Sequence, residues 1–206
     1  MQSISPIPLS VASFGKFGSI VSPDEEISKL DSSQKNANQG TAIKISKVSN
    51  ISNQFSENHG VKNPNCNLFR CFTKLPLQKS FKCCDSDNLS DSLHYEIKVL
   101  EKHPFSTQTF IPMGRATASG YAYLVVTALP DKAGEPDLSS LNAFLCKPNQ
   151  VVTYGAGVWH APMIVVGKEE HLDFAVIINE LLDDRKPECD LQERFYDGQL
   201  ALQLHY

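Results

Sequence analysis

The chain has 206 residues, of which 41% are apolar, and a formal net charge of −4. This length and apolar fraction suffice for one packed domain, and the weak negative charge removes the electrostatic reason to expect nucleic acid or an anionic membrane as a partner. No apolar run approaches the roughly 20 residues that span a bilayer, so no membrane partner is expected.

The N-terminus and the cysteines both indicate a cytoplasmic protein. The N-terminus has neither a basic segment nor a long apolar run, so no secretion signal is predicted. The cysteines show no paired zinc spacing, and the adjacent pair would form a strained disulfide. Reduced thiols are therefore expected for Cys66, Cys71, Cys83, Cys84, Cys146 and Cys189.

The first 64 residues alternate between short regular elements and polar stretches. Residues 9–21 predict a short helix followed by a strand that glycines interrupt. Residues 22–39 and 50–64 are rich in polar side chains and predict surface loops. Between these loops, residues 41–48 alternate apolar and polar side chains, which predicts a half-buried strand.

The rest of the chain reads as short strands separated by turn residues. A polar insertion at residues 80–91 and a loop containing Pro and Gly at residues 130–138 interrupt this run. Residues 200–204 fit either the start of a helix or a closing strand, because so few residues show no period. Many short strands without long helical periods predict an all-β jelly roll or barrel with a few short helices, as one domain over residues 1–206. The predicted strands cover residues 67–72, 93–100, 120–129, 141–145, 150–154, 163–166 and 172–178.

Two polar motifs lie far apart in this β-type sequence. The first is Glu101-Lys-His103-Pro-Phe-Ser-Thr-Gln108, and the second ends in Gly157-Val-Trp-His160. Residues two apart in a strand lie on one face, so Glu101 and His103 are expected side by side. Such side chains converge only if a sheet brings the distant segments together, which predicts a pocket in a small β-barrel.

The spacing of these motifs resembles the cupin superfamily. In cupins the first motif carries two histidines, an acid and a glycine, and here Glu101, His103, Gln108 and Gly114 stand at those places. The second cupin motif ends in Gly-x-x-His, which residues 157–160 match. The phrases His-Pro, Thr-Gln, Phe-Ile-Pro-Met, Pro-Asp-Leu and Val-Trp-His around them closely resemble the ureidoglycolate lyase family, in a fungal-type member.

The resemblance implies a cupin-like double-stranded β-helix that cleaves (S)-ureidoglycolate to glyoxylate and urea. This carbon–nitrogen lyase reaction belongs to purine nitrogen catabolism, downstream of allantoin. The resemblance further implies a homodimer with a small-molecule substrate. It also suggests a divalent metal, nickel or another transition metal, which the sequence itself does not require.

Four residues form the predicted metal and catalytic set. In the cupin register His103 points into the barrel to bind a metal or transfer protons, although a histidine before proline can also simply cap a turn. Gln108 then lies on the same inward side and orients a substrate oxygen, or else it faces solvent. Glutamine holds a cation less firmly than an acid would. Glu101 is a ligand or a solvated charge, and His160 lines the pocket or is a buried structural residue. The predicted metal ligands are Glu101, His103, Gln108 and His160, and the last three are the predicted catalytic residues.

Three further residues are predicted to bind substrate. Arg70 offers a planar two-point donor for a carboxylate and Lys44 offers a point charge, while either can equally be a surface charge. Tyr154 stands where lyases of this type also carry tyrosine. Its hydroxyl can donate to an oxyanion, or the ring can be a plain core aromatic.

Two other functions stay open at this point. The first is a different metal-dependent cupin enzyme that acts on another small hydroxy acid, although Gln108 and Glu101 in place of the usual acid and histidine argue against it. The second is a non-catalytic cupin module that binds a small molecule. Ligand binding without turnover would identify it.

Overall fold

The computed structural model describes residues 2–30, 37–82 and 91–206. In this part of the chain, 13 strands form two sheets of eight and five strands. The larger sheet has the order β1-β13-β5-β10-β7-β8-β2, with β11 paired to β7. Its strands are β1 (Gln2–Ile4), β2 (Ile7–Pro8), β5 (Ser92–Lys102), β7 (Tyr123–Pro130), β8 (Pro136–Cys146), β10 (Trp159–His160), β11 (Ile164–Val165) and β13 (Gln192–His205).

The larger sheet curls until its two ends meet. Strands β1 and β2 are separated by only two residues, yet β1 pairs with β13 and β2 pairs with β8, at opposite ends of the strand order. So short a connection requires the two ends to lie close together, and β1 also contacts β8. The curled sheet therefore encloses an interior of its own.

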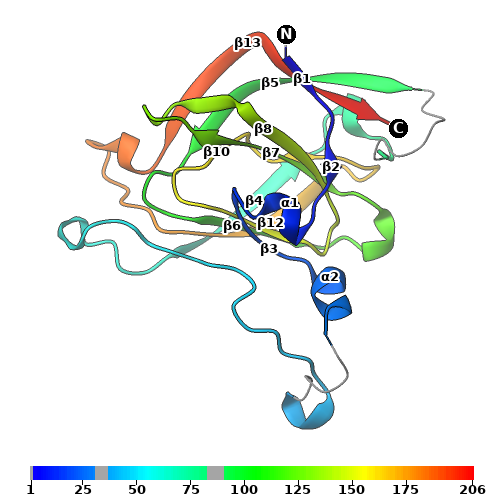
Figure 1. The fold of residues 1–206 in the computed structure, drawn as a ribbon, viewed down its shortest axis with the longest axis horizontal. Coiled ribbons are helices and arrows are strands. Elements are labelled where there is room, and N and C mark those ends of the chain that lie inside the picture. The colour runs from blue at the N-terminus through cyan, green and yellow to red at the C-terminus, as the bar shows by residue number, and fades with distance from the viewer. Residues whose placement is uncertain (1, 31–36, 83–90) are drawn as a thin grey trace.

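The smaller sheet packs against the outside of this curled sheet. All its neighbours are antiparallel, in the order β3-β9-β6-β12-β4. Figure 1 shows three layers, with β5 and β13 above β7, β8 and β10, and the smaller sheet below them. The strands of the smaller sheet are β3 (Gly18–Val21), β4 (Asn65–Phe72), β6 (Gln108–Met113), β9 (Val151–Tyr154) and β12 (His171–Ile178).

Strand β7 separates two apolar cores because its alternate side chains point to opposite faces. Tyr123 and Val125 join Phe110 and Phe174 in a core between the two sheets. Leu124 and other side chains of β7 instead pack inside the curled sheet, against strands β5 and β13. Both faces of β7 are thus buried, which explains why residues 123–128 form the longest fully buried stretch of any strand described here.

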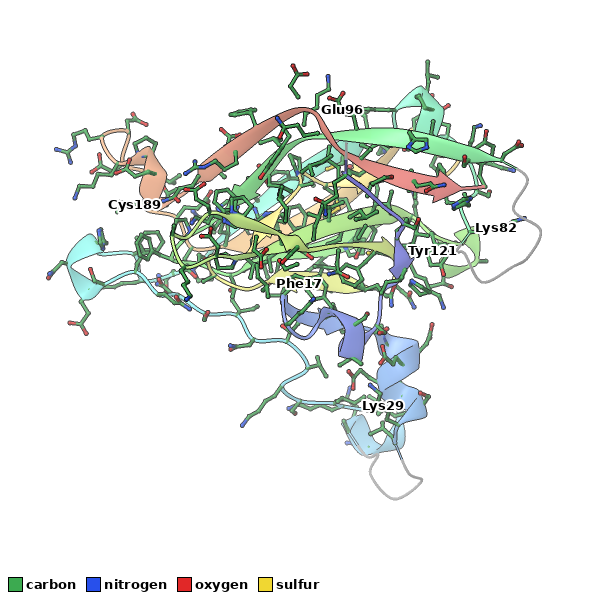
Figure 2. All side chains as sticks on the ribbon, turned by 45° about the horizontal axis from the view of Figure 1, so that its top comes forward. Phe17, Lys29, Lys82, Glu96, Tyr121 and Cys189 are labelled. Carbon is green, nitrogen blue, oxygen red and sulfur yellow. The ribbon has the colours of Figure 1, made fainter. Side chains whose placement is uncertain are left out.

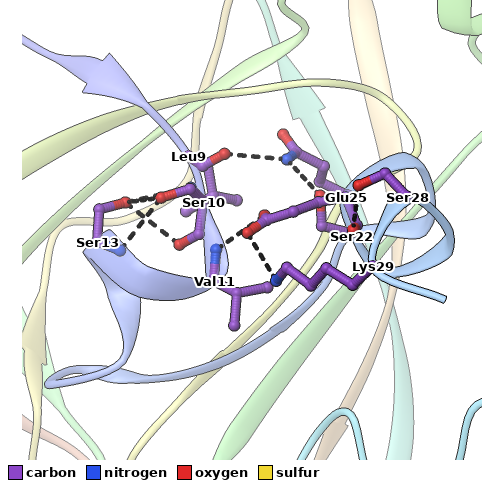
Figure 3. Close-up of polar contacts among 9 residues, drawn as sticks. Leu9, Ser10, Val11, Ser13, Ser22, Glu25, Ser28 and Lys29 are labelled. Carbon is purple, nitrogen blue, oxygen red and sulfur yellow. Dashed lines mark hydrogen bonds and ion pairs between the residues drawn. The ribbon is translucent and has the colours of Figure 1, made fainter. Parts of the chain in front are cut away.

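Two short α-helices lie near the N-terminus, α1 (Val11–Phe14) and α2 (Pro23–Ser28). Ser10 caps α1 by accepting a hydrogen bond from the Ser13 N–H. Glu25 on α2 accepts a hydrogen bond from the Val11 N–H and pairs with Lys29, so this carboxylate ties the two helices together (Figure 3). The single-turn 3₁₀ segments are η1 (Asn38–Gly40), η2 (Glu57–His59), η3 (Leu75–Leu77), η4 (Thr117–Ser119) and η5 (Pro187–Cys189).

The prediction of an all-β, cupin-like barrel with a few short helices is confirmed. Each predicted strand from residue 67 onward overlaps an observed one, and the predicted helix and strand within residues 9–21 correspond to α1 and β3. Of the two alternatives for residues 200–204, the closing strand is correct, because β13 pairs with both β5 and β1. Every helix in the described ranges is too short or too polar to cross a bilayer.

Three sequence predictions differ from the structure. Residues 41–48 do not form a strand; beyond a bridge between Ala37 and Ala42 they pair with no described residue. The predicted loop at 22–39 contains α2, which begins with proline followed by three acidic residues, a pattern that favours a helix start. Strand β8 begins at Pro136, inside the predicted loop 130–138, because β7 extends to pair with it. Most of the insertion at 80–91 lies outside the described residues.

Candidate active site

The site is centred on His160 in the two-residue strand β10. This strand pairs with β5 on one side and β7 on the other, which places Glu101 and Thr127 directly opposite His160. Opposed residues of neighbouring strands point to the same face of a sheet, with Cβ atoms roughly 5 Å apart. Glu101, His160 and Thr127 therefore form a row across three strands, facing the smaller sheet.

His103 joins this row from the loop that follows β5. The Gly157 N–H donates a hydrogen bond of 2.8 Å to the His103 carbonyl, so the backbones of the two sequence motifs are joined directly. Gly157 has φ of +77°, a conformation that glycine adopts without strain. The imidazole rings of His103 and His160 consequently lie with their centroids 5.7 Å apart.

Backbone carbonyls fix the tautomers of both imidazoles. Nδ1 of His103 lies 2.6 Å from the Asp190 carbonyl, and Nδ1 of His160 lies 3.1 Å from the Val158 carbonyl. A carbonyl only accepts, so each Nδ1 carries the proton and each Nε2 presents a lone pair. Nε2 of His103 is buried and has no hydrogen-bond partner among the described residues. It is therefore free to bind a ligand or take up a proton.

The smaller sheet supplies Gln108 and Tyr154, which are cross-strand neighbours on β6 and β9. The Gln108 side-chain oxygen lies 3.1 Å from His160 Nε2. The Tyr154 ring stacks on the His160 ring, with centroids 3.9 Å apart and planes 10° apart. The Tyr154 hydroxyl is buried without a hydrogen-bond partner in the described structure. Together the two sheets enclose the His160 ring.

Burial shifts the titration of the charged groups in the site. Burial raises the pKa of Glu101 to about 7, and the nearby Glu193 carboxylate adds a smaller contribution in the same direction. Burial lowers the pKa of His160 to about 3, and the neighbouring His103 adds a smaller contribution in the same direction. Burial also lowers the pKa of His103. Because His160 is neutral near pH 7, its 3.6 Å contact with Glu101 is not an ion pair.

These side chains also fit a divalent metal ion. The donor atoms of Glu101, His103 and His160 lie within 4.8 Å of one another. As placed, His160 Nε2 faces the oxygens of both Gln108 and Glu101. Three acceptors that face one another require a proton, a rotated amide or a cation between them. Mixed imidazole and oxygen donors of this kind suit nickel, zinc, iron or manganese.

The other two predicted substrate-binding residues lie elsewhere. Arg70 on β4 donates two hydrogen bonds of 2.8 Å to Asp173 on the exposed side of the smaller sheet. Asp173 lies five residues along β12 from Ile178, the residue opposite Gln108, which is a separation of roughly 17 Å. Lys44 is exposed in the unpaired segment after η1. Within one copy of the chain, neither cation reaches the imidazoles.

Two residues of the site were missed by sequence reasoning. Thr127 is fully buried opposite His160, and its hydroxyl has no hydrogen-bond partner among the described residues. Asp190 acts through its backbone carbonyl, while its carboxylate accepts hydrogen bonds from the N–H groups of Leu181 and Leu182 and so holds the loop. A threonine in an apolar strand and a backbone acceptor in a loop carry no sequence signature.

Known proteins resemble this chain over nearly its whole length. A family model described as ureidoglycolate lyase matches residues 1–203. A ureidoglycolate lyase of Saccharomyces cerevisiae is 51% identical over 203 residues, covering 98% of this chain and 99% of the relative. One of Schizosaccharomyces pombe is 34% identical, covering 89% and 87%, and one of Burkholderia mallei is 29% identical, covering 86% and 82%. The matching family model and these identities show that the chain belongs to the ureidoglycolate lyase family.

Proposed function

We propose that this protein is a ureidoglycolate lyase that cleaves (S)-ureidoglycolate to glyoxylate and urea, in the breakdown of allantoin. The family match and the fungal relatives support the reaction. One arrangement carries the proposal. Nε2 of His103 has no hydrogen-bond partner among the described residues, and it lies within 4.8 Å of donor atoms of Glu101 and His160. The pKa of the Glu101 carboxyl group is raised.

The reaction needs one proton acceptor and one proton donor. The reacting carbon of ureidoglycolate carries a hydroxyl, a carboxylate, a hydrogen and the urea nitrogen. When the hydroxyl loses its proton, the O–H electron pair forms the C=O bond of glyoxylate and the C–N pair leaves with nitrogen. The nitrogen then takes a proton to give urea. No water is consumed, and proton transfer from positioned side chains typically contributes a factor of about 10²–10⁴.

His103 and Glu101 suit these two roles. Because the Asp190 carbonyl holds Nδ1–H of His103, Nε2 is the basic atom that accepts the hydroxyl proton. With a pKa of about 7, Glu101 is protonated in a large fraction of molecules near neutrality and can donate to the leaving nitrogen. The proton on His103 then returns to Glu101, which resets the site.

His160, Gln108 and Tyr154 position the substrate in this account. The low pKa of His160 keeps its ring neutral, so it binds without adding charge. The Gln108 amide and the Tyr154 hydroxyl can both donate to a substrate oxygen. The Tyr154 hydroxyl is buried without a hydrogen-bond partner among the described residues, so it gains a partner when substrate binds.

We also infer that the site accepts a divalent metal ion, nickel or another transition metal. Glu101, His103 and His160 would hold it, with the Gln108 oxygen as a weaker fourth ligand. A bound ion would act as a Lewis acid and make the substrate hydroxyl more acidic. Such a metal would occupy Nε2 of His103, so the metal content of active protein separates this arrangement from the one without metal.

We infer that the 206 residues act as one domain in a cytoplasmic homodimer. The site takes residues from both sheets, which supports a single domain. Cys66, Cys71, Cys146 and Cys189 are unpaired thiols, as expected for a reducing compartment. Strand β4 ends the smaller sheet with Leu68 72% exposed, and an apolar strand at a sheet edge favours association with a second copy.

Product analysis tests the proposed function. Purified protein incubated with ureidoglycolate should release glyoxylate and urea in equal amounts, with no ammonia. Ammonia in place of urea would indicate a hydrolase instead. Binding of ureidoglycolate without any product would indicate a non-catalytic binding module and refute the proposal.

A further inference from the structure

A protruding segment of the chain has no evident role within one copy. Residues 37–48, named the arm here, have their tip at η1 far from the two sheets, and the chain after the tip runs back towards the sheets (Figures 1 and 2, in which Lys29 marks α2). The tip of the arm is a defined turn, closed by two backbone hydrogen bonds between Ala37 and Ala42. Within this turn Asn38 and Gln39 hold left-handed φ values of 51° and 58°. The tip is therefore a regular, hydrogen-bonded turn.

Beyond the tip, the arm has the sequence pattern of a strand but no strand partner. Residues 43–48 make no backbone hydrogen bond with any described residue. In an extended chain Ile43 and Ile45 share one face, and Lys44 points to the other. Ile43 is 44% exposed, and Lys44 has no ion pair with the described residues. The arm thus presents an apolar face, a cation and unpaired backbone groups to solvent.

Strand β4 offers a matching partner surface. Its outer edge is unpaired in the smaller sheet, and Leu68 and Phe72 lie exposed on its outer face. On its inner face, Asn65 lies opposite Ile178, which in turn lies opposite Gln108 of the site. Opposed residues of neighbouring strands share a face. A strand added beside β4 with its apolar residues on the outer face would therefore turn its alternate side chains to the same face as Gln108.

Among the described residues, no cationic side chain faces the imidazoles. Glu193 lies opposite Glu101 in the larger sheet, which adds a second carboxylate beside the site. The neighbouring cations Lys102 and Arg194 both lie over the Trp159 ring, which packs inside the curled sheet. A substrate carboxylate entering this acidic region requires a positive partner. A bound metal ion would supply part of that charge, and the described residues of one copy place no side-chain cation there.

We propose that the arm of one copy pairs with the edge of β4 in a second copy and places Lys44 at that copy's site, where its ammonium group binds the substrate carboxylate. Each site of the homodimer is then built from two copies. The inference rests on the proposed function for the identity of the carboxylate and for the homodimer. Docking of the arm on β4 of a second copy does not depend on which reaction the site catalyses.

Complementation in mixed dimers tests the shared site. Two differently tagged copies, one with Lys44→Ala and one with His160→Ala, are co-expressed, and the dimers that carry both tags are isolated. Each variant alone should be impaired, with Lys44→Ala losing about 10- to 100-fold in kcat/KM, mainly through KM, as expected for a charged hydrogen bond. The mixed dimer contains one intact site, formed by the body of the first copy and the arm of the second. It should recover about half of the wild-type activity.

Other outcomes overturn the inference. Mixed dimers no more active than either parent would place Lys44 and His160 in the same copy, and a fully active Lys44→Ala protein would remove Lys44 from the site. The matched control is Lys47→Ala, a substitution of an exposed lysine on the same arm that should leave activity unchanged. If His160→Ala does not fold, His103→Ala replaces it in the mixed dimer.

A crosslinking experiment tests arm exchange without any activity. Copies with Ile43→Cys or Ile45→Cys are mixed with copies carrying Leu68→Cys under mild oxidation, and disulfides are identified by mass spectrometry. A link between the introduced positions of two different copies is expected, whereas mixing with Ile51→Cys should give none. Absence of the link would overturn the docking, whatever the enzyme does. A wild-type protein that shows the link but releases no glyoxylate would refute the proposed function alone.

Discussion

His103 and His160 face each other with ring centroids 5.7 Å apart, and each holds its Nδ1 proton on a backbone carbonyl. This arrangement turns both Nε2 atoms towards the space shared with Glu101. The histidines come from segments more than 50 residues apart, and the Gly157–His103 backbone hydrogen bond brings the segments together. Because backbone groups fix both tautomers, the rings keep their roles without help from other side chains.

Replacement of Glu101 by glutamine should stabilise the protein at alkaline pH. The pKa of Glu101 is raised to about 7 in the folded protein from 4.5, so the folded state loses stability as pH rises through this range. Glutamine carries no charge to bury, so at pH 8 the free energy of unfolding of Glu101→Gln should exceed that of the wild type by about 1–3 kcal/mol. At pH 4 the two proteins should be nearly equal. Urea unfolding at both pH values measures this, and equal stability at pH 8 would contradict the raised pKa.

The rate should depend on pH with two limbs. His103 must be neutral to accept a proton, and its pKa lies below the ordinary 6.5, so kcat/KM should fall on the acidic side of that value. Glu101 must be protonated to donate, so kcat/KM should also fall as pH rises through about 7. In Glu101→Gln the maximal rate should be lower and the alkaline limb should vanish. If the alkaline limb persists in this variant, the ionisation of another group causes it, which would contradict the role of Glu101 as the proton donor.

Metal binding should depend on Glu101, His103 and His160 and on pH. Nickel or zinc added to metal-free protein should raise the melting temperature of the wild type. Because the Glu101 carboxyl must ionise to bind, the shift should be larger at pH 8 than at pH 6. His103→Ala and His160→Ala should reduce it, whereas His94→Ala, an exposed histidine on β5, should not. A shift that all four proteins share would place the metal elsewhere.

The positions of the candidate site residues were largely predictable from the sequence, because motif spacing and strand periodicity decide which residues share a face. Glu101, His103, Gln108 and His160 meet as expected, although their chemical roles stay predictions. The position of Arg70 was not predictable, since strand register puts it opposite Asp173. The strand predicted at residues 41–48 was wrong because, apart from the Ala37–Ala42 bridge, no described residue of the same copy pairs with them, and a sequence pattern alone does not show whether a partner strand exists.

Glycine at position 18 should be indispensable for the support of Tyr154. A Cβ atom on Gly18 would lie 2.0 Å from the Thr153 carbonyl oxygen, and the residue has φ of +152°. Strand β3 pairs with β9 at this point, so the clash falls on the strand that carries Tyr154. Gly18→Ala should cost about 2 kcal/mol or more in stability.

Gly15→Ala is the matched control for this substitution. A Cβ atom on Gly15 meets nothing closer than 3.5 Å, so its stability should stay the same or rise slightly. Thermal melting of both variants gives the comparison. Equal melting temperatures would show that β3 is not held against β9 as described.

The proposed reaction requires His103 to accept the hydroxyl proton and His160 to position the substrate, and steady-state release of glyoxylate from ureidoglycolate tests both requirements most directly. Purified His103→Ala and His160→Ala should each lose about 10²- to 10⁴-fold in kcat while remaining folded, and His94→Ala should match the wild type. Wild-type rates in both folded variants would contradict the account, because the bond would then be cleaved without either imidazole.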